Sequence, residues 1–133
     1  ARAMKETQGV TYVSEIMSTS VVTIDKDASV YKAAKMIMET AFNHLPVISA
    51  DGSLVGIVTA WDISKAVSED KFDLVEDMMT RKVITAKADE RVDVVARRLD
   101  LKGVSALPVL NNENHVIGII TSDDISKLFG RRH

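Results

Sequence analysis

The chain has 133 residues, of which 46% are hydrophobic and 27% charged, with two prolines and no cysteine. This composition is typical of one compact soluble domain or of two very small ones, and it excludes disordered chains, thiolate metal sites and cysteine catalysis. A formal net charge of −2 does not favour the broad basic surface that nucleic-acid binding requires. Apolar runs stay far below the roughly 20 residues that span a bilayer, and no signal peptide is visible. We therefore expect a cytoplasmic protein with neither nucleic acid nor membrane as a partner.

The first predicted elements are a strand and a helix. Val21–Ile24 is rich in β-branched residues, which favours a short strand. Apolar residues then recur at the helical spacing i, i+3, i+4, i+7 and i+11, at Val30, Ala33, Ala34, Ile37 and Ala41. Asp27 precedes this helix at a position expected for an N-cap or a first-turn acid.

A hairpin and a second helix follow. Leu45–Ile48 and Leu54–Thr59 predict two strands joined by a turn at Asp51 and Gly52. The next helix is expected to begin near Asp62. The order is β-α-β-β-α in about 55 residues, too few to bury both faces of the sheet alone.

The same order then repeats. Residues 13–67 align on residues 75–129 without a gap, and 17 of the 55 aligned positions are identical. The clearest pairs are Leu45–Val47 with Leu107–Val109 and Gly56–Lys65 with Gly118–Lys127. The repeat predicts a strand at Val83–Ala86, a helix around Val92–Gly103 preceded by Asp89, a hairpin turning at residues 111–114 and a helix near Asp124. The expected organisation is a leader (1–12), unit 1 (13–67), a linker (68–74), unit 2 (75–129) and a tail (130–133).

Each repeat contains a Thr-x-x-Asp motif between its last strand and last helix. Thr59 with Asp62, and Thr121 with Asp124, fit a capping box, in which the threonine caps the helix and the acid occupies its third position. The same turn also presents backbone N–H groups at the positive end of a helix, and a carboxylate there can accept hydrogen bonds from both hydroxyls of a ribose. Capping and ligand binding are compatible alternatives.

These motifs resemble a tandem pair of cystathionine β-synthase (CBS) domains, often called a Bateman module. The resemblance rests on the gapless repeat, on a methionine ending a short helix in each copy (Val13–Met17 and Val75–Met79), on the Leu-Pro-Val strands and on the Gly-x-x-Thr-x-x-Asp endings. It implies an α/β (α+β) fold of two β-α-β-β-α units packed sheet to sheet with pseudo-twofold symmetry. It also implies a regulatory module, mostly without enzymatic activity, that binds adenosine-containing ligands in clefts between the units.

The resemblance further implies two sites, each completed by both repeats, with the aspartate on the ribose. The first would join Thr59, Asp62, Ile84, Val104, Ser105, Ala106 and Pro108. The second would join Thr121, Asp124, Val22, Phe42, Asn43, His44 and Pro46. Core packing is the alternative role for Phe42 and Val104.

The expected ligand has an adenosine end and an uncharged or cationic far end. No arginine stands at the positions expected for a phosphate partner, and Asp123 adds negative charge beside Asp124. S-adenosylmethionine or methylthioadenosine is therefore favoured, consistent with a narrower likeness to the CBS pairs of archaeal proteins of homocysteine synthesis. An AMP or ATP sensor, or a structural dimerisation module without ligand, remains the alternative.

Trp61 is the only tryptophan, and it aligns with Asp123 in the other repeat. It could stack on a ligand or pack at a subunit interface. The resemblance implies a homodimer and an upstream or partner effector domain. Asp62, Asp123 and Asp124 could gather a divalent ion or form an acid–base pair, but solvated helix starts are favoured, and we expect no catalytic residue, metal or cofactor.

Overall fold

The computed structural model describes residues 9–70 and 73–130, and parts of the predicted leader, linker and tail lie outside them. The described residues form two compact units, each an α+β arrangement with its own three-stranded sheet. One, the β1–β3 unit, comprises Val22–Val83 and Glu113–Val116; the other, the β4–β6 unit, takes the described residues of Ala1–Val21, Ile84–Asn112 and Ile117–His133.

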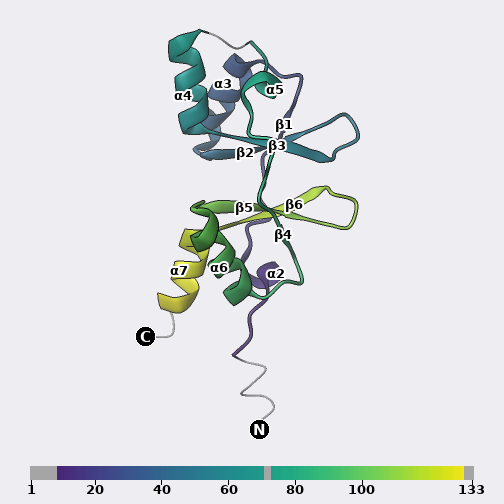
Figure 1. Cartoon of the computed structure of the whole chain (residues 1–133), viewed down its shortest axis with the longest axis vertical. Helices are drawn as coiled ribbons and strands as arrows, with labels where there is room; N and C mark the ends of the chain where they lie inside the picture. Colours follow the sequence, from purple (N-terminus) through teal and green to yellow (C-terminus); the bar gives the residue numbers. More distant parts are fainter. Residues whose placement is uncertain (1–8, 71–72, 131–133) are drawn as a thin grey trace. The chain divides into compact units, whose positions relative to one another are not determined.

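In the β1–β3 unit, the strands β1 (Ile24–Asp25), β2 (His44–Ile48) and β3 (Leu54–Thr59) form the sheet in the order β1-β2-β3. β1 runs parallel to β2, which pairs antiparallel with β3. Helices α3 (Val30–Thr40) and α4 (Ala60–Glu69) cover one face of this sheet, together with the short α5 (Val75–Met78) (Figure 1). The predicted hairpin with its turn at Asp51 and Gly52 is confirmed.

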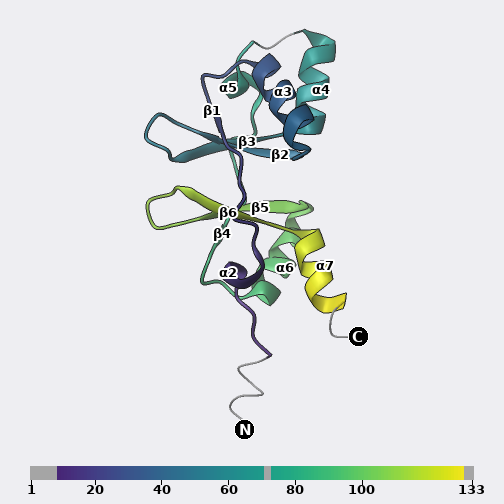
Figure 2. The same cartoon turned by 180° about the vertical axis from the view of Figure 1, so that it is seen from behind.

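The β4–β6 unit repeats this order. Strands β4 (Ala86–Lys87), β5 (Ala106–Leu110) and β6 (Val116–Thr121) form its sheet, with β4 parallel to β5. Helices α6 (Val92–Lys102) and α7 (Ser122–Gly130) and the short α2 (Val13–Ile16) lie on one face of it (Figure 2).

The structure corrects the bounds of the first strand in each repeat. Val21–Ile24 and Val83–Ala86 were the expected strands, but pairing begins only at Ile24 and Ala86 and lasts two residues. The parallel ladder joins Ile24 to Val47 and Asp25 to Ile48. The residue of β2 before Val47 is Pro46, which has no N–H to donate to a ladder, so the pairing is not extended toward Val21. β-branching therefore indicated a strand in this region but did not predict the length of the ladder.

The expected caps of the long helices were also wrong. Asp27 and Asp89 lie in turns two residues before the caps, which are Ser29 and Arg91. Ser29 Oγ accepts the N–H of Lys32 at 3.0 Å, as an N-cap serine does. The predicted linker (68–74) begins too early, because α4 includes Ser68 and Glu69. Residues 71–72 of this linker lie outside the described part of the chain.

The short helices are exchanged between the repeats. Val13, from the start of repeat 1, is fully buried in the apolar core of the β4–β6 unit, and Val75, from the start of repeat 2, is fully buried in the core of the β1–β3 unit. The Val13 N–H donates to the Glu90 carbonyl and the Val75 N–H to the Ala28 carbonyl, both at 2.9 Å. These bonds satisfy N–H groups that a helix start leaves without an intrahelical partner. Each compact unit therefore contains chain from both repeats.

Candidate functional site

The start of helix α4 is built around Thr59 and Asp62. Thr59 is the N-cap in extended conformation, and its Oγ1 accepts the Asp62 N–H at 3.2 Å. In return, the Thr59 N–H donates to Asp62 Oδ2 at 3.0 Å. The capping box predicted from the sequence is confirmed. A carboxylate offers about four lone-pair positions, so this contact uses only part of the acceptor capacity of Asp62.

Helix α7 begins in the same way. The Asp124 N–H donates to Thr121 Oγ1 at 3.1 Å, and the Thr121 N–H donates to Asp124 Oδ2 at 2.9 Å. All four side chains of the two motifs are partly exposed. Both helix starts therefore place a threonine hydroxyl and a carboxylate where a solvent-borne ligand can reach them.

The segment before each Leu-Pro-Val strand lies against the helix start of the same unit. The Ala60 N–H donates to the Asn43 carbonyl at 2.9 Å, and His44 is the β-sheet partner of Thr59. In the β4–β6 unit, the Ser122 N–H and hydroxyl both donate to the Ser105 carbonyl, at 2.9 and 3.2 Å. Sequence reasoning missed the contact of the Ser122 hydroxyl, because Ser122 has alanine as its counterpart in repeat 1 and belongs to no repeated motif.

His44 brings a titratable ring to the first of these sites. Its imidazole is partly buried, and burial lowers its pKa, while the negative charge of Asp62 acts in the opposite direction. The ring is therefore mainly neutral at neutral pH. Its counterpart in repeat 2 is the buried Ala106, so the two sites differ in this group.

The other predicted site residues divide evenly between the units. Val22 packs against the core of the β1–β3 unit and Ile84 against that of the β4–β6 unit. Phe42 and Val104 are exposed, at 40% and 38%, which contradicts core packing as their alternative role. Pro46 and Pro108 are fully buried within β2 and β5. Within the units, Thr59 and Asp62 lie with Asn43 and His44, and Thr121 and Asp124 with Ser105; the pairings across the repeats remain a prediction.

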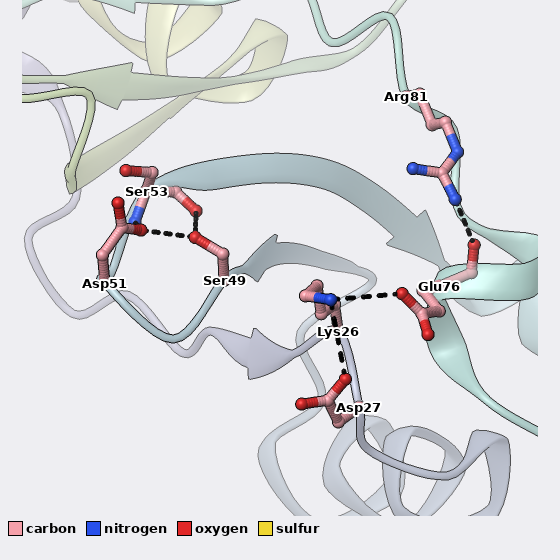
Figure 3. A network of polar contacts seen from close by, with 7 residues as sticks. All are labelled: Lys26, Asp27, Ser49, Asp51, Ser53, Glu76 and Arg81. Carbon is pink, nitrogen blue, oxygen red and sulfur yellow. Dashed lines mark hydrogen bonds and ion pairs between the residues drawn. The ribbon is translucent and has the colours of Figure 1, made fainter.

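A second polar cluster lies away from the helix starts (Figure 3). Lys26 Nζ is 3.5 Å from Glu76 Oε2 and 3.8 Å from Asp27 Oδ1, and Arg81 Nη2 donates to the Glu76 carbonyl at 3.1 Å. Nearby, the Ser49 hydroxyl and the Ser53 N–H donate to Asp51, and these bonds lower the pKa of Asp51 to about 2. In this cluster Lys26 pairs with carboxylates, and the bonds to Asp51 close the hairpin turn. These contacts stabilise the fold, so the cluster needs no ligand to explain it.

Metal binding and membrane insertion find no support in the described residues. Across residues 9–70 and 73–130, no group of three or more His, Asp or Glu side chains could hold a metal ion. In the same part of the chain, no helix has the length and apolar character needed to cross a bilayer.

Comparison with known proteins identifies the family. The family model for the CBS domain matches residues 13–69 and 75–131, so the chain belongs to the CBS domain family and carries two copies. It is similar, with a TM-score of 0.86 and 43% identity, to the solved CBS domain pair of protein MJ0100 in complex with 5′-methylthioadenosine and S-adenosyl-L-methionine, covering 93% of this chain and 99% of that one. The α+β fold that the resemblance implied for the two units is thereby confirmed.

The curated relatives are longer archaeal enzymes. The L-aspartate semialdehyde sulfurtransferase of Methanosarcina acetivorans is 56% identical over the whole chain, which spans 27% of that protein. The homoserine O-acetyltransferase of Methanohalobium evestigatum is 45% identical over 89% of this chain and 24% of its own length. The chain thus spans about a quarter of these relatives, and the expected likeness to archaeal proteins of sulfur amino acid synthesis is confirmed.

Proposed function

We propose that the chain is a non-catalytic regulatory module that binds adenosine-containing molecules through its two Thr-x-x-Asp helix starts. The observation that carries the proposal is the duplicated geometry: both motifs hold a threonine and a carboxylate in the same contacts, on partly exposed turns. A capping role alone requires neither the same residue pair twice nor exposure. In the proposed complex each carboxylate accepts hydrogen bonds from ribose hydroxyls while it still caps its helix.

The surroundings of the motifs support a ligand whose far end is neutral or cationic. At neutral pH the mainly neutral His44 ring gives little charge assistance to a phosphate. At the other site, Asp123 stands next to Asp124, although Lys127 pairs with it at 3.2 Å and reduces its field. A sulfonium is favoured by such carboxylates and a polyphosphate is not. Methylthioadenosine and S-adenosylmethionine, both bound by the 43% identical CBS pair, are our first candidates.

The comparison of relatives supports a role in regulating an attached or associated enzyme. The same pair makes up about a quarter of proteins named for two different reactions. A module shared in this way is suited to report a metabolite level rather than to perform either reaction. A ligand can shift such a module between conformations only by binding one of them more tightly.

Isothermal titration calorimetry with methylthioadenosine, S-adenosylmethionine, AMP and ATP tests the proposal. We expect the two sulfur nucleosides to bind more tightly than AMP or ATP. Asp62→Ala and Asp124→Ala should each remove one binding event or weaken it at least tenfold, since one charge-assisted bond contributes roughly 1.5–3 kcal/mol.

The matched control is Ser29→Ala, which removes the N-cap of α3 in the same unit as Asp62. It should cost stability as the loss of a cap does, about 1 kcal/mol, without changing ligand affinity. Binding that survives both aspartate variants would refute our ribose assignment. If no compound of the panel binds, the structural dimerisation module becomes the better reading, and tightest binding of AMP or ATP would replace the ligand class.

A further inference from the structure

The backbone carbonyls of Asn43 and Ser105 occupy equivalent positions beside the two helix starts. Both residues are exposed, and each directly precedes a strand, β2 or β5. Each carbonyl accepts the N–H of the first residue of the following long helix, from Ala60 of α4 and from Ser122 of α7, both at 2.9 Å. Because each of these helices begins at a Thr-x-x-Asp motif, both carbonyls lie beside a candidate ligand site.

The two carbonyls differ in how much of their acceptor capacity is used. A backbone carbonyl oxygen has two lone pairs. The Ser105 oxygen receives a second hydrogen bond, from the Ser122 hydroxyl at 3.2 Å, so both of its lone pairs are occupied. Position 60 holds alanine, which has no hydroxyl, and within the described residues the Asn43 carbonyl accepts the Ala60 N–H alone. One lone pair of the Asn43 oxygen is therefore left for water or for a ligand.

The capping contacts of the two helix starts are closely matched. The two bonds of the first Thr-x-x-Asp motif are 3.0 and 3.2 Å long, and those of the second are 2.9 and 3.1 Å long. The main-chain bonds to the Asn43 and Ser105 carbonyls also have the same length, 2.9 Å. Exchanging alanine and serine at positions 60 and 122 therefore changes the number of donors to one carbonyl and leaves the main-chain contacts in place.

We propose that the Asn43 carbonyl selects ligands whose base carries an N–H donor, and that the Ser122 hydroxyl withdraws the Ser105 carbonyl from the same task. The inference rests on the proposed function. In an adenosine compound the exocyclic amine is the only N–H donor of the base, whereas an inosine compound has an acceptor oxygen in its place. That oxygen would face the open lone pair of the Asn43 carbonyl and repel it, and the carbonyl would lose its partner. The Ser105 carbonyl has no open lone pair, so it does not distinguish the two bases.

Two reciprocal substitutions, Ala60→Ser and Ser122→Ala, exchange the residues of the two repeats and test the proposal. Isothermal titration calorimetry measures the binding of methylthioadenosine and of methylthioinosine to each full chain, with circular dichroism as a check of folding. Methylthioadenosine has no N–H group other than those of its exocyclic amine. Because His44 is unchanged in these variants, a change in the preference between the two nucleosides reports on the carbonyls. The matched control is Ser126→Ala, which removes an exposed hydroxyl one turn further along α7.

We expect two binding events in the wild type. One should prefer methylthioadenosine by roughly threefold to tenfold, the range of one neutral hydrogen bond, and the other should bind both nucleosides equally. Ala60→Ser supplies a second donor to the Asn43 carbonyl and should abolish the preference of the first event. Ser122→Ala frees a lone pair of the Ser105 carbonyl and should give the second event the same preference. Ser126→Ala should change neither event.

Three results would overturn this inference and leave the proposed function standing. The first is an equal preference in both events of the wild type. The second is a preference that stays unchanged in both exchange variants. The third is a variant that weakens both nucleosides by the same factor, which would show that Ser122 or Ala60 acts only on the stability of the turn. A wild type that binds neither nucleoside also overturns the inference, and titration of the remaining adenosine ligands then shows whether the proposed function fails with it.

Discussion

At the scale of single residues, His44 couples the candidate site to pH. Burial lowers the pKa of its imidazole in the folded chain, and the Asp62 carboxylate only partly opposes this. The unfolded chain therefore binds the His44 proton more readily than the folded chain does. Unfolding takes up this proton as the pH falls below the ordinary histidine pKa of about 6.5, so the free energy of unfolding decreases there.

Urea unfolding of the wild type and of His44→Gln, at about pH 7.5 and about pH 5.5, measures this coupling. The stability of the wild type should fall more than that of the variant between the two conditions. An identical fall in both proteins would show that His44 does not contribute to the pH dependence.

Gly118 is required by the close approach of another segment to β6. A Cβ at this position would lie 2.6 Å from Met17 Sδ and 3.0 Å from the Ser18 carbonyl oxygen. The methionine can move, but the carbonyl belongs to backbone paired with Ile119. We expect Gly118→Ala to cost about 1–3 kcal/mol, in the range of overpacked cores.

Thermal or urea unfolding checks this cost, with Gly130→Ala as the control, since a Cβ at Gly130 meets nothing within 4 Å. Equal stabilities of the two variants would mean that the segment around Met17 is displaced at no cost.

Residue patterns in the sequence were sufficient for the Thr-x-x-Asp contacts, because a capping box depends on residues three apart. They could not predict the burial of His44 or its proximity to Asp62, since both depend on the pairing of β2 with β3. The contact of Ser122 with the Ser105 carbonyl was also missed, because it depends on how the start of α7 lies against the segment before β5. Local chemistry is readable from the sequence, whereas contacts across strands are not.

At the scale of elements, an ion pair joins helix α6 to the segment before it, and helix α3 has no such pair at the equivalent positions. Arg98 Nη1 lies 2.9 Å from Glu90 Oε1 and donates to the Thr85 carbonyl at 2.8 Å, and Arg98 Nη2 lies 2.5 Å from Glu90 Oε2. In repeat 1 the two positions hold Ala28 and Met36. The hydrogen bonds from Arg98 lower the pKa of Glu90. The pair therefore stabilises the fold above the ordinary glutamate pKa and ceases to do so as the pH falls through the lower folded value.

We expect Glu90→Gln to lower the free energy of unfolding by about 1 kcal/mol at neutral pH, as partly exposed bidentate pairs do. The difference from wild type should shrink as the pH falls below about 4.3. Unfolding at a series of pH values measures it. Asp27→Asn, which changes an exposed carboxylate 3.8 Å from Lys26, is the control and should have little effect. A pH-independent difference would assign the loss to packing rather than charge.

The elements show where periodicity is informative. The long helices and the first hairpin were predicted because the apolar stripe of an eleven-residue helix and a Gly-containing turn are local signals, and the gapless repeat extended the hairpin to repeat 2. The two-residue strands β1 and β4 were misplaced because their bounds depend on where the partner strand lies. The caps were misassigned because a turn inserted two residues between the acids and the helices.

At the scale of the whole molecule, the repeat predicted two similar units but not how the chain divides between them. Both short helices were expected from the Val13–Met17 and Val75–Met79 segments, and both are present. Nothing in their sequences indicates which sheet each one covers, since the two segments are nearly interchangeable in apolar character. Only the tertiary contacts of Val13 and Val75 show the exchange.

Because the short helices are exchanged, a substitution at the start of one repeat should destabilise the sheet of the other repeat. Val13→Ala should destabilise the β4–β6 unit, 60 or more residues away along the chain, and Val75→Ala should destabilise the β1–β3 unit, each by about 2 kcal/mol, because both side chains are fully buried. Hydrogen exchange resolved by residue measures this as faster exchange in β5 for the first variant and in β2 for the second. Faster exchange of β2 in Val13→Ala would place α2 on its own repeat.

The exchanged helices imply that neither repeat alone contains a complete core, so a chain cut between the repeats should yield two unstable halves rather than two small domains.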